Sequence, residues 1–524
     1  MELERLQLLV PMVSVDFIAY ASNTTADSVN SMLAGSPLNP QVTLVINELK
    51  ALIDTQFPNG DTETDGVYNV NEHLRMLNLS SLLGSQYQGN SIGNALRVMA
   101  GGTLPLSSGS TTLEQEIGKL ARDIYPILLL PRDDGSHFLD FMNISSMIIP
   151  SVMRNSYEPF FDAVEADDVL NGLYVAQGQN RHFKNFNYWL NTGSGTGQQL
   201  ISLPSELIIP AYYKVQIEGK LTPEDFISQV IENLQLFRRM ANNETVEVPA
   251  YVAINGVSLP ENVELQLPWG TLRNPTSTEL NLLSQRSQMI NSVLVIPFKL
   301  KMKKSSNNSM SSPYPFPQDR ARENVDEAAM LTFATIMISL GKEIRTDNVG
   351  TIILPNFGHS PSTSWMFEKP GAANHTLSSA DRTKITRISG KLETYKKHLS
   401  IALRRNLMAI NRLDTLDGFI DSIIAMESLF GSERETTFTV SSAMAKFLKS
   451  DAEQKLELKK EIGKLYNERS KIIHGASFPA PQTIEVKRQR VIDLNIEVLR
   501  KLLYRRNDLI DCASNERSTK ILLT

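Results

Sequence analysis

Apolar positions in the last third of the chain recur every three to four residues, which is the spacing that buries one face of a helix. This pattern predicts five helices with short connections, over Asp381–Arg412, Asp414–Phe430, Phe438–Leu448, Ala452–His474 and Ile484–Leu509. Gly431 and Gly475 follow the second and fourth of these stretches, and glycine is typical of helix ends. Helices of this length with short connections favour an up-down bundle, which we place at residues 375–515.

The middle of the chain has a different pattern, rich in valine and isoleucine, that predicts strands. The predicted strands are Glu244–Ile254, Val263–Leu267, Ser292–Leu300 and the short buried Thr351–Pro355. Asn255-Gly256 lies between the first two strands and is a hairpin-type turn signal. Residues 303–318 contain three prolines and few apolar residues, which indicates a linker, and Asn324–Leu340 is an apolar helix. We therefore expect a β-rich domain at residues 241–370.

The first 240 residues are mixed and mainly helical. Helical spacing predicts helices over Val42–Phe57, Thr111–Leu128 and Pro223–Asn242, and Gly/Ser-rich sequence predicts loops over Gly101–Ser110 and Gly193–Gly197. The predicted fold class is thus α+β and multidomain. It has a mainly helical N-terminal region (1–240), a β-rich middle domain and a C-terminal all-α bundle.

Composition excludes several classes of protein. The 524 residues include a single cysteine, Cys512, so neither a disulfide framework nor a zinc-ribbon site is available within one chain. The longest apolar runs, such as Ile124–Leu130, are far shorter than the roughly 20 residues that cross a bilayer. With no secretory signal pattern at the N-terminus, these features predict a cytoplasmic location and no membrane partner.

Charge is unevenly distributed along the chain. The whole chain has a net charge of −5, but residues 381–524 hold 27 Lys and Arg against 19 Asp and Glu, a net of +8. The first 380 residues carry a net of −13. A basic module on an acidic body points to a polyanionic partner for that module, although Lys- and Arg-rich solvated helix faces give the same balance.

The fourth predicted helix ends with Leu465-Tyr466-Asn467-Glu468-Arg469-Ser470-Lys471-Ile472-Ile473-His474-Gly475. An arginine and a histidine suit the metal-free cleavage of RNA, because the ribose 2′-OH supplies the nucleophile. Histidine exchanges a proton near neutral pH, and arginine binds phosphate oxygens with a fixed charge. Arg469 and His474 are about 140° apart around an ideal helix, and one histidine poorly serves as both acid and base. Two copies that face each other across a two-fold axis would supply both. The spacing by itself also fits an arginine in a surface ion pair and a histidine that caps a helix.

Two motifs together resemble the HEPN fold, and specifically its ApeA-like branch, over roughly residues 380–510. The first motif runs from Asp417 through Asp421 and Glu427 to Gly431, and the second is the run that ends at His474-Gly475. The resemblance implies a dimeric helical bundle and, in many members, metal-independent ribonuclease activity used in bacterial defence against phages. It carries Arg469 and His474 onto the catalytic positions and Glu427 onto the acidic position of the first motif. Tyr466 and Ser470 are the accompanying residues of the second motif.

This sequence departs from the family pattern in two places. Ser470 stands where the commoner motif has Asn, Asp or His, and Met426 replaces the usual leucine, which conserves volume. Residues 1–240 resemble no family, and Val263–Arg273 is loosely similar to sequences found before such HEPN domains.

Other residues offer alternative chemistry. A metal cluster could be formed by Asp417, Asp421 and Glu427. We favour instead an ion pair between Glu427 and Arg469, which would orient the guanidinium. Several basic residues would line an RNA groove through phosphate contacts, or lie on solvated helix faces: Lys396, Lys397, Arg404, Arg405, Lys471, Lys487, Arg488, Arg490, Arg505 and Arg506. His182 lies in a small basic and aromatic cluster, and His359 and His375 have no partner ligands nearby in sequence.

The sequence therefore predicts a metal-independent RNA endonuclease that needs no cofactor and acts as a homodimer. His474 would be the general acid or base, and Arg469 would stabilise the phosphate in the transition state. RNA and a second copy of the chain are the expected partners. The acidic first 370 residues would hold the nuclease inactive or sense a phage-derived trigger or regulatory partner. The alternative is a non-catalytic HEPN module for dimerisation or for binding nucleotides or RNA.

Overall fold

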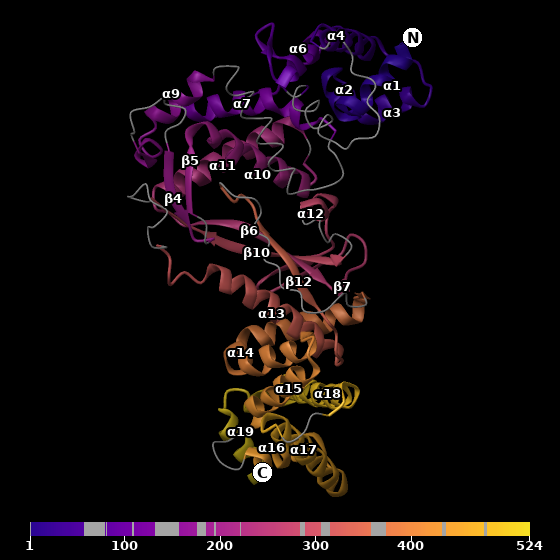
Figure 1. The fold of residues 1–524 in the computed structure, drawn as a ribbon, viewed down its shortest axis with the longest axis vertical. Helices are drawn as coiled ribbons and strands as arrows, with labels where there is room; N and C mark the ends of the chain where they lie inside the picture. Colours follow the sequence, from indigo (N-terminus) through magenta and orange to yellow (C-terminus); the bar gives the residue numbers. More distant parts are fainter. Residues whose placement is uncertain are drawn as a thin grey trace.

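The chain forms an elongated molecule, with helices at both ends and sheets between them (Figure 1). This computed structural model describes residues 2–56, 79, 81–106, 109–131, 157–175, 185–192, 195–220, 222–282, 289–304, 315–357, 374–431, 436–475 and 479–524. Helices predominate, and the sheets are small and antiparallel apart from one short parallel pair, so the fold belongs to the predicted α+β class.

The N-terminal end has a hydrophobic core of its own, built from Leu9, Phe17, Leu49 and neighbours between residues 6 and 130. The helices around it are α1 (Glu2–Val13), α2 (Val15–Ala21), α3 (Ala26–Leu33), α4 (Pro40–Gln56) and α6 (Ile92–Met99), with the short hairpin β1 (Gln86–Tyr87) and β2 (Asn90–Ser91). Helix α4 corresponds to the predicted helix at 42–57.

A second layer of helices joins this end to the rest of the chain. It comprises α7 (Thr112–Leu128), α9 (Glu158–Ala166), α10 (Leu203–Ile217) and α11 (Pro223–Ala241), with the 3₁₀ turns η1 (Asn171–Leu173) and η3 (Leu200–Ser202). Thr111 and Glu114 form a capping box that starts α7, and Thr222 caps α11. The predicted helices at both places are confirmed.

Strands from either side of residue 240, the predicted domain boundary, pair with each other. Strand β11 (Met302–Lys304) pairs with β4 (Asn185–Leu190), which also pairs with β3 (Tyr174–Val175) and β5 (Gly195–Gln199). One hydrophobic core continues from Leu113 to Ile521. The described α-helices from α7 onward thus contribute to this core, although Ile127 of α7 and Leu130 belong to the N-terminal one, and the division between the cores falls inside the region 1–240.

The middle of the molecule is a five-stranded antiparallel sheet in the order β12-β6-β10-β9-β8 (Figure 1). The strands are β6 (Val246–Asn255), β8 (Glu264–Leu267), β9 (Gly270–Arg273), β10 (Ser292–Leu300) and β12 (Asp347–Ile353). The four predicted strands are all present. Helix α13 (Ala321–Leu340) packs on β6 and β10, and the short α12 (Ser277–Leu282) packs on α10.

The hairpin predicted at Asn255-Gly256 is wrong. Strand β6 pairs with β10 and β12, whereas β8 pairs with β9. Gly256 has a φ of 91° and leads instead into β7 (Val257–Ser258), which pairs in parallel with β13 (His375–Thr376). A turn signal reports only a local change of direction, and the partners of β6 come from much later in the chain.

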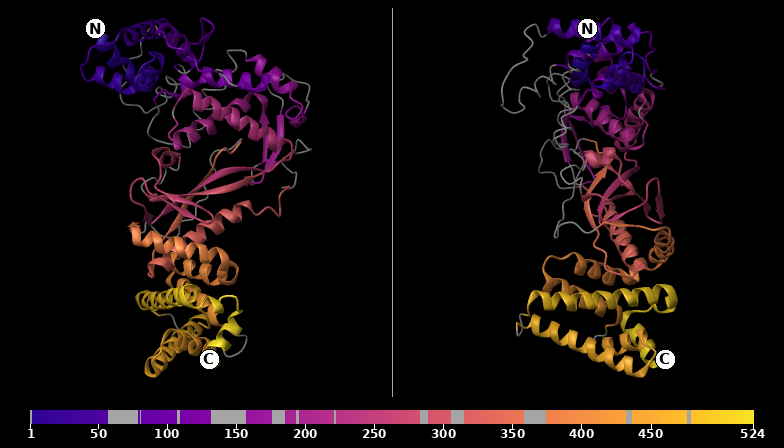
Figure 2. Two further views of the ribbon diagram at one scale, coloured as in Figure 1. Left: turned by 180° about the vertical axis from the view of Figure 1, so that it is seen from behind. Right: turned by 90° about the vertical axis from the view of Figure 1, so that its right-hand side faces the viewer.

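The C-terminal end is all helical. It consists of α14 (Ser379–Asn411), α15 (Thr415–Phe430), α16 (Thr436–Leu448), α17 (Ala452–Ile473), α18 (Pro481–Arg505), the 3₁₀ turn η5 (Asn507–Leu509) and α19 (Ser514–Leu523). The five predicted helices are confirmed. Helix α14 packs on α13 and also contacts β8, and α15 packs on α14 and α18, so the bundle is attached to the sheet through α13 and through α14 itself (Figure 2).

Helix α19 extends the helical domain beyond the predicted end at residue 515. Arg517 is 1 % exposed and donates hydrogen bonds to the carbonyls of Leu429, Leu509, Ile510 and Cys512. This buried cation ties the last helix to the end of α15, so α19 is an integral part of the bundle.

Candidate functional site

The site lies at the C-terminal end of α17, the helix that carries the second motif. Asp451 caps its start by accepting a 3.0 Å hydrogen bond from the backbone N–H of Gln454. Leu458, Ile462 and Leu465 are buried and hold one face of the helix against the bundle. The backbone N–H of His474 donates to the carbonyl of Ser470 at 3.0 Å, and Gly475, with a φ of 68°, ends the helix.

The cap at Asp451 has a predictable effect on the helix that carries the site. Replacing Asp451 with alanine is expected to destabilise the chain by about 1 kcal/mol, because the first turn of α17 loses its side-chain acceptor. Asp451→Asn keeps an acceptor oxygen and is the matched control. Urea unfolding followed by circular dichroism measures both, and equal midpoints for the two variants would contradict the role of the cap.

The ion pair predicted between Glu427 and Arg469 is present. Glu427 on α15 and Arg469 on α17 place Oε1 and Nη1 3.4 Å apart, with both side chains less than a third exposed. Burial raises the pKa of the Glu427 carboxyl, and the Arg469 guanidinium opposes that shift. The pair therefore holds the guanidinium at the contact between α15 and α17.

Tyr466 lies one turn before Arg469 and is 4 % exposed. Burial, with a smaller contribution from the charge of Glu427, raises the pKa of its phenol. Among the described residues, neither the Tyr466 hydroxyl nor Nε of Arg469 has a hydrogen-bond partner, although both atoms are buried. These orphaned donors leave hydrogen-bonding capacity beside the ion pair, which a bound anion or a water molecule would satisfy.

The structure separates Arg469 from His474 within one chain. Arg469 faces α15, whereas His474, Ser470 and Lys471 are exposed at the end of α17. This agrees with the rotation of about 140° that an ideal helix imposes over five residues. A single chain thus presents the imidazole to solvent and keeps the guanidinium mostly inside the bundle.

The predicted RNA-binding residues differ in exposure. Arg404 is exposed, and Arg405 lies 2.6 Å from Asp421. Lys487 lies 3.0 Å from Glu468. Each of the last two cations therefore already has a carboxylate partner.

The prediction that Arg488 contacts RNA is wrong. Its side chain is fully buried, not on an RNA-binding face, and it donates to the backbone carbonyls of Ala409 and Ile410. It also pairs with Glu485, and its Nη2 lies 3.7 Å from Glu343 Oε1. Its guanidinium is thus enclosed by the bundle, where no phosphate reaches it.

The carboxylates proposed as an alternative metal cluster face arginines. Asp421 is held by Arg405 and by Arg412, whose Nε lies 2.7 Å from its Oδ2, and Asp417 lies 3.6 Å from Arg412. Within the described ranges, no group of three or more His, Cys, Asp or Glu side chains is arranged to hold a metal ion. The carboxylates of the first motif, Asp417, Asp421 and Glu427, therefore form ion pairs with arginines.

The remaining candidates lie elsewhere. Gly195–Gln199 forms strand β5 where we predicted a flexible loop, because these residues pair with β4. Residues 193 and 194, His182 and His359 are outside the described residues. Nε2 of His375 lies 3.9 Å from Oδ2 of Asp381, six residues later in the chain.

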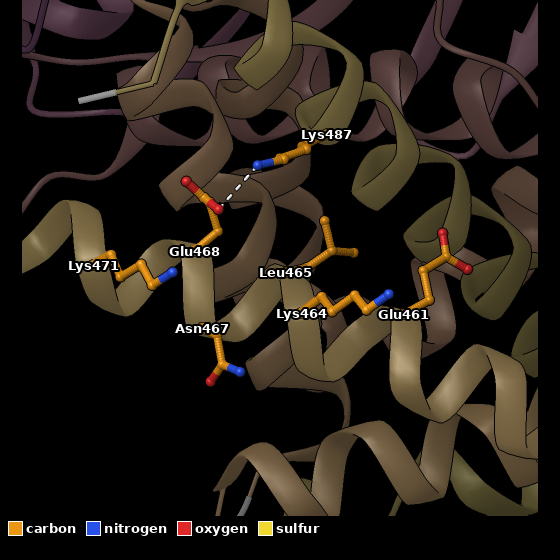
Figure 3. Close-up of a pocket in the computed structure, with 7 residues that line it drawn as sticks. All are labelled: Glu461, Lys464, Leu465, Asn467, Glu468, Lys471 and Lys487. Carbon is orange, nitrogen blue, oxygen red and sulfur yellow. Dashed lines mark ion pairs between the residues drawn. The ribbon is translucent and has the colours of Figure 1, made fainter. Parts of the chain in front are cut away.

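A hollow of about 470 Å³ lies along α17 where that helix faces the start of α18, and Glu427, Arg469 and His474 are not among its lining residues (Figure 3). Its lining comes from α17 and from Lys487 at the start of α18: Glu461, Lys464, Leu465, Asn467, Glu468, Lys471 and Lys487. Sequence reasoning identified Lys471 and Lys487 but missed Lys464 and Asn467. The signal for them was their spacing of seven and four residues before Lys471, which places all three on one helix face.

Comparisons with models of protein families, with curated proteins and with solved structures find no match to this chain. The resemblance to HEPN domains therefore stays a prediction from the two sequence motifs. In the part of the chain that is described, no helix has both the length and the apolar character needed to cross a membrane.

Proposed function

We propose that this protein is a metal-independent RNA endonuclease of the HEPN type, whose active site is shared between two copies of the C-terminal bundle. The observation that carries the proposal is the end of α17, where an exposed His474 follows an Arg469 that is oriented by Glu427. The orphaned Nε of Arg469 and hydroxyl of Tyr466 support it, since a phosphate would satisfy buried donors.

The chemistry needs one proton acceptor and one proton donor. A neutral His474 would take the proton of a ribose 2′-OH while the 2′ oxygen attacks the adjacent phosphorus. The bond from phosphorus to the 5′ oxygen breaks, and a protonated His474 of the partner subunit would donate to that oxygen. The products are a 2′,3′-cyclic phosphate and a 5′-OH end. Arg469 would stabilise the negative charge that grows on the phosphate oxygens.

The surrounding architecture fits a regulated effector. The bundle is attached to the acidic remainder of the chain through α13 and through the contact of α14 with β8, and these contacts offer a route by which that remainder would restrain the nuclease. By resemblance to the family, the role would be defence against phages by growth arrest in the cytoplasm. The test is cleavage of RNA by the full chain in the presence of EDTA, together with toxicity on expression.

Arg469 offers a test of the phosphate-stabilising role. Replacing Arg469 with alanine is expected to lower kcat for RNA cleavage about 10²–10³-fold, because a donor to the transition state is lost. Arg469→Lys keeps the charge but not the fork geometry, and we expect an intermediate rate. Single-turnover cleavage measures both, and an alanine variant as fast as the lysine variant would contradict the assigned role.

A further inference from the structure

The outer face of α17 carries a straight row of polar side chains that ends at His474. Lys460, Lys464, Asn467 and Lys471 follow one another at helical spacing, and His474 comes three residues later. All of them are exposed. At 1.5 Å per residue the row extends for about 21 Å along the helix. We call Lys460, Lys464 and Lys471, with Asn467 between them, the lysine row.

The lysine row keeps its positive charge. None of its three lysines forms an ion pair within the described residues, whereas two carboxylates on the flank of the same helix are already neutralised. Glu461 accepts from Arg490 at 2.7 Å, and Glu468 lies 3.0 Å from Lys487. Helix α18 therefore provides basic partners for Glu461 and Glu468 beside the row, while Glu453 and Glu457 are exposed near its N-terminal end, in a module whose net charge is +8.

The hollow beside the row has a mixed lining. Figure 3 shows Lys464, Asn467 and Lys471 projecting from α17 around it, and Lys487 reaching across from α18 to Glu468. Leu465 is buried and provides apolar surface. The amide of Asn467 both donates and accepts hydrogen bonds, as base edges and ribose hydroxyls require. A volume of about 470 Å³ is within the usual range of small-molecule sites and suits a group of nucleotide size.

We infer that the lysine row is the track along which the phosphate backbone of single-stranded RNA approaches His474. This inference rests on the proposed ribonuclease function and adds the form of the substrate and its path. Lysines in a row contact successive phosphates without reading sequence, while Asn467 meets a base or ribose in the hollow. A single row on one helix follows one strand, whereas duplex RNA is bound across successive minor grooves.

The test uses the full chain with His474→Ala, so that RNA is bound but not cut. The probe is a fluorescein-labelled single-stranded oligoribonucleotide of about 20 nucleotides, titrated at several salt concentrations. Each phosphate contact on a single strand contributes about 0.7 to the salt slope of binding. Adding Lys460→Gln, Lys464→Gln and Lys471→Gln together is expected to weaken binding at least about tenfold at low salt and to reduce the slope by about two.

A matched control removes the same charge elsewhere. Lys299, Lys342 and Lys384 are exposed lysines outside α17, and their replacement by glutamine is expected to leave the salt slope within about 0.7 of the parent. Circular dichroism checks that both triple variants are folded. Equal slopes for the two triple variants, or no binding of RNA by the parent, would overturn the inference. A duplex RNA competitor as effective as the single strand would overturn the assignment to single strands.

The two proposals fail in different ways. If the wild-type chain binds RNA through the lysine row but does not cleave it, the ribonuclease proposal is contradicted and the role of the row in RNA binding is supported. The triple variant of the row is also made with His474 intact. If this variant cleaves RNA with an unchanged KM, the lysine row is contradicted as an RNA-binding track and the ribonuclease proposal is supported.

Discussion

Replacing His474 with alanine is expected to lower the rate of RNA cleavage by about 10²–10⁴-fold, which is the usual contribution of a positioned general acid or base. In a shared site the loss affects both proton transfers, because each subunit supplies one imidazole. The imidazole is exposed at the end of α17, so its removal leaves the core of the bundle unchanged. The measurement is cleavage of a labelled RNA in EDTA, with the product ends identified as 2′,3′-cyclic phosphate and 5′-OH.

His398 provides the matched control for this experiment. It is an exposed histidine of the same bundle, on α14, with Nε2 3.8 Å from Asp511. His398→Ala should cleave at the wild-type rate. Cleavage that EDTA abolishes would instead favour the carboxylates of the first motif as metal ligands. A dimer that binds RNA or nucleotide but cuts nothing would favour the non-catalytic HEPN module.

Arg488→Ala is expected to destabilise the C-terminal bundle by about 3–5 kcal/mol, the usual cost of breaking a buried ionic network. The guanidinium is enclosed by the helices and donates to the carbonyls of Ala409 and Ile410 at the end of α14. Removing it leaves those carbonyls without their donor, and Glu485 and Glu343 lose a partner. Urea unfolding of the full chain, followed by circular dichroism, measures the loss.

Arg404→Ala is the control, because Arg404 is exposed on α14 and surface substitutions usually change stability by less than about 0.5 kcal/mol. Arg488→Met, which keeps the length of the side chain without its charge, tests whether the hydrogen bonds or the volume matter. An Arg488→Ala variant that is as stable as the wild type but binds RNA more weakly would contradict the structural role and favour a contact of Arg488 with an RNA phosphate.

Some contacts of the site were accessible from sequence. The pairing of Glu427 with Arg469 followed from the two motifs, since an acidic residue on one buried helix tends to meet the cation of its neighbour. The separation of Arg469 from His474 followed from their spacing, because five residues rotate a helix by about 140°. The buried state of Tyr466, with its orphaned hydroxyl, did not follow, because it depends on how α15 packs on α17.

The basic residues at the start of α18 show why the sequence did not predict which side chains are accessible to RNA. Lys487 and Arg488 are neighbours and looked equivalent as RNA contacts, yet one adjoins the hollow and the other is completely enclosed. Adjacent residues on a helix point about 100° apart, so only one of them faces the bundle. Which one it is depends on the position of α14, whose carbonyls accept from Arg488.

By itself, the sequence determined most of the local elements: the five C-terminal helices, four of the five strands of the middle sheet and the single face of α17 that is apolar. These depend on the periodicity of side chains along a few turns, which the chain encodes locally. Only the tertiary structure decided that β6 pairs with β10 and β12, that β11 joins β4 across the predicted boundary, and that Arg488 is buried. Such contacts join residues far apart in the chain, and their choice is made by the packing of whole elements, which no local pattern specifies.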